Sequence, residues 1–204
     1  MKRSCRQGGF SDRPNNHGQG LWRKSIRIRP MVLSLAAICA VGGLVAGISP
    51  ATENADDQAA ANAITQGKLP PGYRDWRLIS LAHEEGNLHS LGAILGNNVA
   101  IEAYRKGQIP YPDGTIIAAL HYRHVASEEN NKIFGKSQSF IPGAPTNTQF
   151  MIKDSTKYAS TGGWYFAHFN TDGKAVTDAA TLRSCYECHA REKDRDLVFT
   201  QYAP

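Results

Sequence analysis

Cysteine is scarce in this sequence of 204 residues. It contains four cysteines, of which Cys5 and Cys39 lie in the first 39 residues, whereas Cys185 and Cys188 lie three positions apart near the C-terminus. If the N-terminal segment is removed during export, only the second pair remains. One pair cannot form the network of disulfides that stabilises small secreted domains. The remaining chain of about 150 residues must therefore rely on a hydrophobic core, for which that length is sufficient.

Excess positive charge is also absent from most of the chain, although the net charge of the whole is +5. Residues 1–30 hold eight Lys or Arg and one acidic residue, a net charge of +7, whereas residues 31–204 hold 15 basic and 17 acidic residues, a net charge of −2. A nucleic-acid-binding domain needs a basic surface to contact phosphates. Because the excess of basic residues is confined to the N-terminal segment, we expect no nucleic-acid partner.

The N-terminal segment has the pattern of a secretory signal. Its basic start is followed by 18 uncharged, mostly apolar residues, Met31–Ile48, and then by the small residues of Ser49-Pro50-Ala51. This order is typical of a signal peptide. We therefore interpret residues 1–51 as a leader, with cleavage expected after Ala51 and a periplasmic location for the protein. Retention of the leader as a membrane anchor is the alternative, because 18 apolar residues can just span a bilayer.

The rest of the chain divides into a spacer and one domain. Residues 52–71 are rich in Ala, Asn and Asp and predict a spacer helix or linker, and residues 72–204 alternate between short apolar runs and helical patterns. Strands are expected at residues 76–82, 88–95, 115–125, 146–153 and 164–169, helices at 96–107, 154–160 and 176–189, and a polar loop at 126–145. Short strands with helices inserted between them predict an α+β domain, an antiparallel β-sheet with packed helices.

The motif Cys185-Tyr-Glu-Cys188-His189 near the C-terminus carries the most specific chemistry. Two thiols at this spacing can form thioether bonds with the two vinyl groups at one edge of a porphyrin, and the histidine that follows can bind the iron. The motif therefore predicts a single covalently attached haem c, with Cys185 and Cys188 as its anchors and His189 as the axial ligand.

Three other interpretations explain the motif less completely. A structural zinc site needs four ligands, and the domain has no second cysteine pair to supply them. A thiol–disulfide exchange site is expected at the start of a helix that follows a strand, whereas this pair lies at the end of a predicted helix. Two unrelated structural cysteines would leave His189 without a role.

The second axial position of the iron decides what such a haem can do. Fifteen residues follow His189 and none is methionine or histidine, so a sixth protein ligand must come from upstream. The candidates are Met151, His83, His89, His121, His124 and His168. Each also has an ordinary explanation as a core or surface residue, and an open or water-filled position is equally consistent. His121 and His124 fall on opposite faces of the predicted strand, so at most one of them can face the haem.

Several stretches together resemble the cytochrome P-460 family, which also includes the cytochromes c′-beta. They are LPPGYRDW at Leu69–Trp76, YPDGTIIAALHY at Tyr111–Tyr122, FMIKDSTKYASTGGWYFAHF at Phe150–Phe169 and CYECHAREKDRDLVFTQY at Cys185–Tyr202. The resemblance covers the chain from about Leu69 to its end, and this ordered set is more specific than the haem motif alone.

The resemblance implies a mostly antiparallel sheet with helices packed on it, often in a homodimer. It implies a five-coordinate c-type haem with an open distal side, in which Cys185 and Cys188 form the thioethers and His189 is the proximal ligand. The P-460 enzymes of the family oxidise hydroxylamine and carry a lysine cross-linked to the porphyrin. The c′-beta members have an apolar distal pocket and bind nitric oxide or carbon monoxide.

This sequence departs from the enzymes at the cross-link. In those proteins the lysine lies on the strand after the DGT turn, but Thr115–His124 contains no lysine, and our alignment places Ala119 at that position. Alanine has no nucleophile, so the cross-link cannot form there. His121 and Arg123 share the face of Ala119 and are candidates for polar groups near the haem edge or on its distal side. The hydroxylamine chemistry therefore does not follow from the resemblance.

The leading hypothesis is an exported mono-haem c-type cytochrome with an open distal site that binds nitric oxide, carbon monoxide or nitrogen oxides and is redox-active. Its redox partner in the periplasm is unknown. The alternatives are a hydroxylamine-oxidising P-460 enzyme, an electron-transfer cytochrome with a filled sixth position, and a helical-bundle cytochrome c′, which also carries its haem motif near the C-terminus.

Overall fold

The computed structural model describes residues 50–203, so the interpretation of residues 1–51 as a leader concerns a segment outside the described residues except at its last two positions. The helices are α1 Pro50–Thr65, α2 Asn98–Lys106, α3 Glu128–Phe134 and α4 Ala179–His189, with short 3₁₀ turns at Tyr73–Asp75, Ala159–Thr161 and Lys193–Arg195. Within the described range, none of the helices combines the length and the apolar character needed to cross a membrane.

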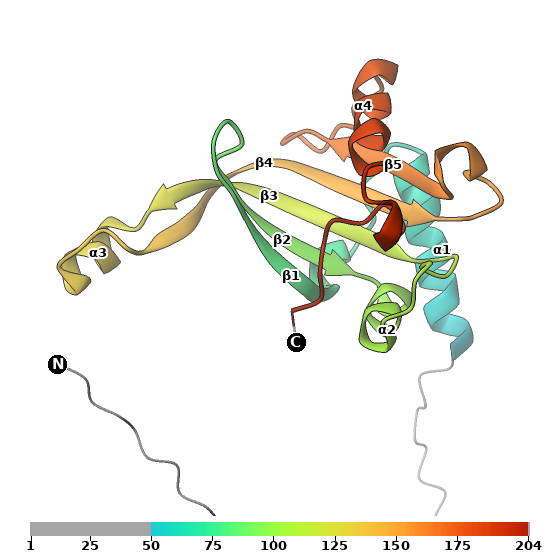
Figure 1. Ribbon diagram of the computed structural model, residues 1–204, viewed down its shortest axis with the longest axis horizontal. Coiled ribbons are helices and arrows are strands. Elements are labelled where there is room, and N and C mark those ends of the chain that lie inside the picture. Colours follow the sequence, from blue (N-terminus) through green and yellow to red (C-terminus); the bar gives the residue numbers. More distant parts are fainter. Residues whose placement is uncertain (1–49, 204) are drawn as a thin grey trace, which may run out of the picture. The chain divides into compact units, whose positions relative to one another are not determined.

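Five strands form a single antiparallel sheet in which neighbours in the sequence are neighbours in space (Figure 1). They are β1 Arg77–Glu84, β2 Ser90–Gly96, β3 Ile116–Ala126, β4 Phe140–Lys153 and β5 Trp164–Phe169. The predicted α+β fold with an antiparallel sheet and packed helices is confirmed. Because each strand pairs with the next one along the chain, short connections suffice and no crossover is needed.

The sheet buries both faces, and each face has its own hydrophobic cluster. Successive side chains of a strand point to opposite faces, so Ile116, Ala118 and Leu120 of β3 pack with Phe150 on one side. Helix α1 covers this side, where Ile64 is only 1% exposed. The helix in the predicted spacer region thus contributes directly to the core of the domain.

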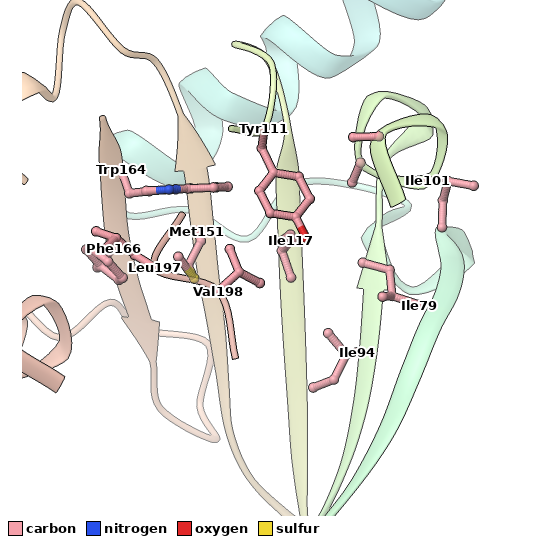
Figure 2. Close-up of a cluster of buried hydrophobic side chains, with 12 residues drawn as sticks. Ile79, Ile94, Ile101, Tyr111, Ile117, Met151, Trp164, Phe166, Leu197 and Val198 are labelled. Atoms are coloured by element: carbon pink, nitrogen blue, oxygen red, sulfur yellow. The ribbon is translucent and has the colours of Figure 1, made fainter. Parts of the chain in front are cut away.

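The other face of the sheet is covered by α2 and by the C-terminal segment, residues 190–203, which follows α4. Ile117 of β3, Met151 of β4 and Phe166 of β5 lie here with Leu197 and Val198, as Figure 2 shows. Strand residues and C-terminal residues therefore form one cluster, which holds the end of the chain against the sheet.

The prediction of a polar loop at residues 126–145 is wrong. This segment contains α3 and the first part of β4, and it extends with β3 as an arm beyond the rest of the sheet (Figure 1). Ser127 caps α3 by accepting a hydrogen bond from the backbone N–H of Asn130. Oδ1 of Asn131 accepts bonds of 2.9 and 2.8 Å from the backbone N–H groups of Gln138 and Ser139. Local hydrogen bonds stabilise the arm, and the apolar periodicity used for the prediction does not report them.

The helix predicted at residues 154–160 is also wrong, because this segment forms turns and a single 3₁₀ turn. Oδ1 of Asp154 accepts hydrogen bonds from the backbone N–H groups of Thr156 and Lys157, which closes a turn where the sequence predicted the start of a helix. Gly162 and Gly163 follow with φ angles of 68° and 85°, and this left-handed conformation prevents a helix from continuing.

Candidate functional site

Helix α4 positions the C-terminal motif. Its N-cap is Asp178, and one carboxylate oxygen accepts bonds of 2.7 Å from both the backbone N–H and the hydroxyl of Thr181. Cys185 and Cys188 are one helical turn apart and are both free thiols, and His189 is the last residue of the helix. Residues three or four positions apart share one side of a helix, so the helical register places the motif on one side of α4.

A cleft with a volume of about 300 Å³ lies between the sheet, α4 and the C-terminal segment. Cys185 and His189 line it from α4, and Phe199 lines it from the C-terminal segment. The strands contribute Ser80, Leu81, Ala82, Glu84, Ile94, Ile117, Ala119, His121, Gln149, Phe150, Met151, Phe166 and Ala167. Most of this lining is apolar, which suits a large flat hydrophobic group.

The imidazole of His189 is held in a defined orientation. Its Nδ1 lies 2.7 Å from the carbonyl oxygen of Leu197, and a carbonyl can only accept, so Nδ1 carries the proton. The ring lies between Phe166 and Phe199, with centroid distances of 5.0 and 4.9 Å. Burial lowers the pKa of His189, and the bond to Leu197 opposes this only in part. A neutral imidazole with its Nε2 lone pair free is the form that binds a metal.

The thiol of Cys185 is protected from ionisation. Burial raises its pKa, a backbone hydrogen bond opposes this shift, and the neighbouring Cys188 raises the pKa further. The thiol lies 3.4 Å from the carbonyl oxygen of Thr181, to which it can donate. Thiol–disulfide exchange needs an accessible thiolate, so this environment does not favour the redox interpretation.

The zinc interpretation receives no support from the part of the chain that the structure describes. Within residues 50–203, no group of three or more His, Cys, Asp or Glu side chains is arranged to hold a metal ion. A structural zinc ion needs four such ligands.

Strand β3 presents two of the three predicted residues to the cleft. Ala119 lies opposite Ile94 of β2 and Gln149 of β4, and all three line the cleft. His121, two residues further, also lines it. Arg123 shares their face by alternation but is exposed and lies beyond the cleft, opposite Ser90. The position that our alignment assigns to the family's cross-linked lysine therefore faces the cleft, and it carries a methyl group.

Comparison with known protein families shows which family the chain belongs to. The model of the family Cytochrome P460 matches residues 70–200, which include all five strands and the whole motif. The chain belongs to the cytochrome P460 family. No curated protein matched the chain.

The family is one of haem-binding cytochromes, so haem with its iron is the cofactor that membership implies. The site of this P460-family chain fits that group in three respects. The cleft is largely apolar, a neutral imidazole lines it with Nε2 unbonded, and the thiol of Cys185 lines it one turn before that imidazole. Cys188 is exposed and lies outside the lining. His189 would hold the iron, and the two thiols would hold the porphyrin edge.

The remaining candidates for a sixth ligand are spread over the sheet. Met151 lines the cleft and is 8% exposed, and it packs in the cluster shown in Figure 2. His168 lies opposite Gln149 but does not line the cleft. His83, His89 and His124 form a separate group at the base of the arm, with ring centroids 4.4 Å apart for His83–His124 and 4.8 Å apart for His89–His124. As the alternation predicts, His121 lines the cleft and His124 does not.

Sequence reasoning missed several residues of the cytochrome P460 cleft. Gln149 and Phe166 could have been found from the alternation of β4 and β5, because each shares a face with Met151 or pairs with it. Val198 and Phe199 carried no such signal. They lie in an irregular C-terminal segment, so no periodicity indicates which way their side chains point.

Proposed function

We propose that this chain is an exported mono-haem c-type cytochrome with a five-coordinate iron, which binds small ligands such as nitric oxide, carbon monoxide or nitrogen oxides and is redox-active. The observation that carries the proposal is the asymmetry of the cleft. On the α4 side it presents a neutral imidazole and a thiol, whereas the sheet side presents mainly apolar residues such as Ile94, Ile117 and Ala119.

The residues of α4 anchor and orient the cofactor in this proposal. Cys185 and Cys188 would hold the porphyrin through thioether bonds, and His189 would offer its Nε2 lone pair to the iron while Nδ1 stays bonded to Leu197. When bound, the haem supplies the iron that takes up the ligand and exchanges electrons. Phe166 and Phe199 restrict rotation of the imidazole, since the rings of both pack against it.

The sheet side sets the polarity that an incoming ligand meets. The side chains of Ile94, Ile117 and Ala119 offer no hydrogen bonds and exclude water, which favours small neutral ligands over charged ones. His121 and Gln149 add polar groups to the same cleft. Burial lowers the pKa of His121, the charge of Glu84 opposes this shift and His168 reinforces it. A mainly neutral His121 can donate one hydrogen bond to a bound ligand without adding a full charge.

The hydroxylamine-oxidising alternative is disfavoured by position 119. A lysine on β3 would reach into the cleft from there, but Ala119 cannot form a cross-link. Lys153 of β4 does not line the cleft, and its amino group is 2.8 Å from the carboxylate of Asp196. The helical-bundle cytochrome c′ alternative conflicts with the five-stranded sheet.

Export to the periplasm is part of the proposal and is supported by the sequence of residues 1–51. Covalent haem attachment outside the cytoplasm agrees with such a leader. A periplasmic electron donor or acceptor and a homodimer follow from the resemblance to the family, and the partner remains to be identified by experiment.

One experiment tests the proposal. The full chain is produced in a bacterium that attaches c-type haem, the periplasmic fraction is purified, and its intact mass and ferrous absorption spectrum are recorded with and without carbon monoxide. We expect the mass of the chain from residue 52 plus one haem, and a high-spin ferrous spectrum that changes on adding carbon monoxide. A low-spin spectrum indifferent to carbon monoxide would overturn the open site.

Two controls separate the alternatives. A mass lower than that of one haem bound through two thioethers, by the hydrogens lost when a lysine nitrogen bonds to the porphyrin, together with a strongly red-shifted ferrous Soret band, would indicate the cross-linked enzyme. Met151→Leu nearly conserves side-chain volume and removes the thioether sulfur. We expect the variant to bind carbon monoxide as the unmodified protein does, whereas binding that appears only in the variant would identify Met151 as a sixth ligand.

A further inference from the structure

Two consecutive residues after α4 adopt the left-handed backbone conformation. Asp196 has a φ of 50° and Leu197 a φ of 66°. Aspartate tolerates this region, but a bulky residue such as leucine rarely occupies it, so the surrounding structure must hold it in place. The backbone of Leu197 matters because its carbonyl oxygen is the partner of Nδ1 of His189, at 2.7 Å.

Asp196 is fixed by three hydrogen bonds to the body of the domain. Its Oδ1 accepts from Nζ of Lys153 at 2.8 Å, and its Oδ2 accepts from the backbone N–H of Tyr111 at 2.9 Å. Its backbone carbonyl accepts from Nε1 of Trp164, also at 2.8 Å. These partners come from β4, from β5 and from the segment before β3, so the turn is tied to three separate parts of the chain.

The amino group of Lys153 is buried in its contact with Asp196. Its side chain is 5% exposed and that of Asp196 is 12% exposed. Nζ also lies 3.2 Å from the carbonyl oxygen of Gly162 and 5.0 Å from the ring centroid of Trp164. A buried ion pair is weak support for stability, because desolvation offsets most of the attraction between its charges. The geometry that the Lys153–Asp196 pair fixes is therefore more informative about its role than its contribution to stability.

Leu197 is confined from its other side as well. Its N–H donates to the carbonyl oxygen of Glu192 at 2.8 Å, and its side chain packs against Gly162, where an added Cβ would lie 2.7 Å from Cδ1. The turn can therefore move little once Asp196 is anchored.

We propose that the Lys153–Asp196 ion pair is a positioning device for the proximal histidine. By fixing the left-handed turn at Asp196 and Leu197, it aims the Leu197 carbonyl at Nδ1 and so sets the rotation of the imidazole and its strength as a ligand. The inference rests on the proposed function, in which His189 binds the iron. Hydrogen bonding to the second ring nitrogen raises the basicity of a histidine ligand, so loss of this bond weakens the ligand.

The test uses the haem-loaded protein and four variants. Lys153→Met and Asp196→Asn each remove one charge, and the double variant Lys153→Met with Asp196→Asn removes both, which avoids an unpaired buried charge and protects folding. The control is Glu192→Gln, which weakens the neighbouring ion pair Glu192–Arg195 of 2.6 Å in the same turn without touching Asp196. Resonance Raman spectra of the ferrous protein give the iron–histidine stretching frequency, and thermal unfolding gives stability.

We expect the three variants of the ion pair to shift this frequency downward and the reduction potential upward, with Glu192→Gln unchanged in both. The shift should persist in the double variant even where its stability recovers. Unchanged frequencies in all three variants, or an equal shift in Glu192→Gln, would overturn the proposal and leave the pair with a purely structural role.

A second readout does not depend on the haem. In protein labelled with ¹⁵N-histidine, nuclear magnetic resonance reports the proton on Nδ1 of His189 and its exchange with solvent. We expect slow exchange in the unmodified protein and faster exchange in the variants of the ion pair, and equal rates would refute the positioning role. If the unmodified protein carries no haem, the proposed function fails, and this measurement on the haem-free chain still tests the ion pair.

Discussion

Nδ1 of His189 lies 2.7 Å from the carbonyl oxygen of Leu197, which leaves Nε2 as the ring nitrogen free to bind iron. We predict that His189→Gly abolishes the five-coordinate ferrous spectrum, because the variant lacks that nitrogen. Imidazole added to the solution should restore the spectrum in part by occupying the space left by the side chain. His83→Ala, which lies outside the cleft, serves as the control and should retain the original spectrum. A normal spectrum in His189→Gly without imidazole would refute the assignment.

Covalent attachment can be tested at the two thiols separately. We expect Cys185→Ala and Cys188→Ala each to retain haem through one thioether, and the double variant to release it under denaturing conditions, because no thiol then remains in the domain after export. Intact mass after denaturation distinguishes the two single variants, which keep the haem, from the double variant, which loses it. A haem that stays bound in the double variant would reveal an attachment point other than the motif.

Among the helix-capping side chains that the structure describes, Asn97 is the one whose replacement should lower the free energy of unfolding most. Its Oδ1 accepts from the backbone N–H groups of Ala100 and Ile116, both at 3.0 Å, and its Nδ2 donates to the carbonyl oxygen of Gly114 at 2.8 Å. Asn97→Ala leaves two buried backbone N–H groups and one part-buried carbonyl without their partner, so we expect the free energy of unfolding to fall by about 3 kcal/mol.

Ser127→Ala is the matched control for that substitution. Ser127 caps α3 with a single side-chain bond, and its replacement should cost about 1 kcal/mol. Urea unfolding of the two haem-loaded variants gives both values. Equal losses would show that Asn97 acts only as a cap and does not connect α2 to β3.

Stability should depend on pH through His121 and His168. Burial is the main reason why the pKa of His121 lies below its ordinary value of 6.5. Burial also lowers the pKa of His168 from 6.5. As pH falls below 6.5, the unfolded state takes up protons before the folded state does, so folding loses stability in the window between 6.5 and the lowered pKa values. The free energy of unfolding should therefore decrease with falling pH in that window and level off below it.

His121→Gln should reduce this pH dependence while preserving a polar side chain in the cleft. Urea unfolding at several pH values measures the slope. The outcome that contradicts the prediction is an unchanged slope in the variant, or stability that increases as pH falls below 6.5.

Local sequence patterns predicted most of the helices and strands. The helical pattern of residues 176–189 indicated α4, and all five strands were recognisable from short apolar runs. The two errors, at residues 126–145 and 154–160, concern segments governed by side-chain bonds of Asn131 and Asp154. Such bonds can form in several backbone conformations, so the residue type does not say which one is adopted.

The motif at Cys185–His189 and the ordered family stretches were determined by the sequence itself, because thioether attachment and axial ligation depend on spacing within five residues. The tertiary structure decided which residues complete the site. Leu197 faces His189 because the turn at Asp196 is anchored to distant parts of the chain, among them Lys153, 43 positions away. Contacts of this kind depend on how distant segments pack, and neither periodicity nor composition encodes them locally.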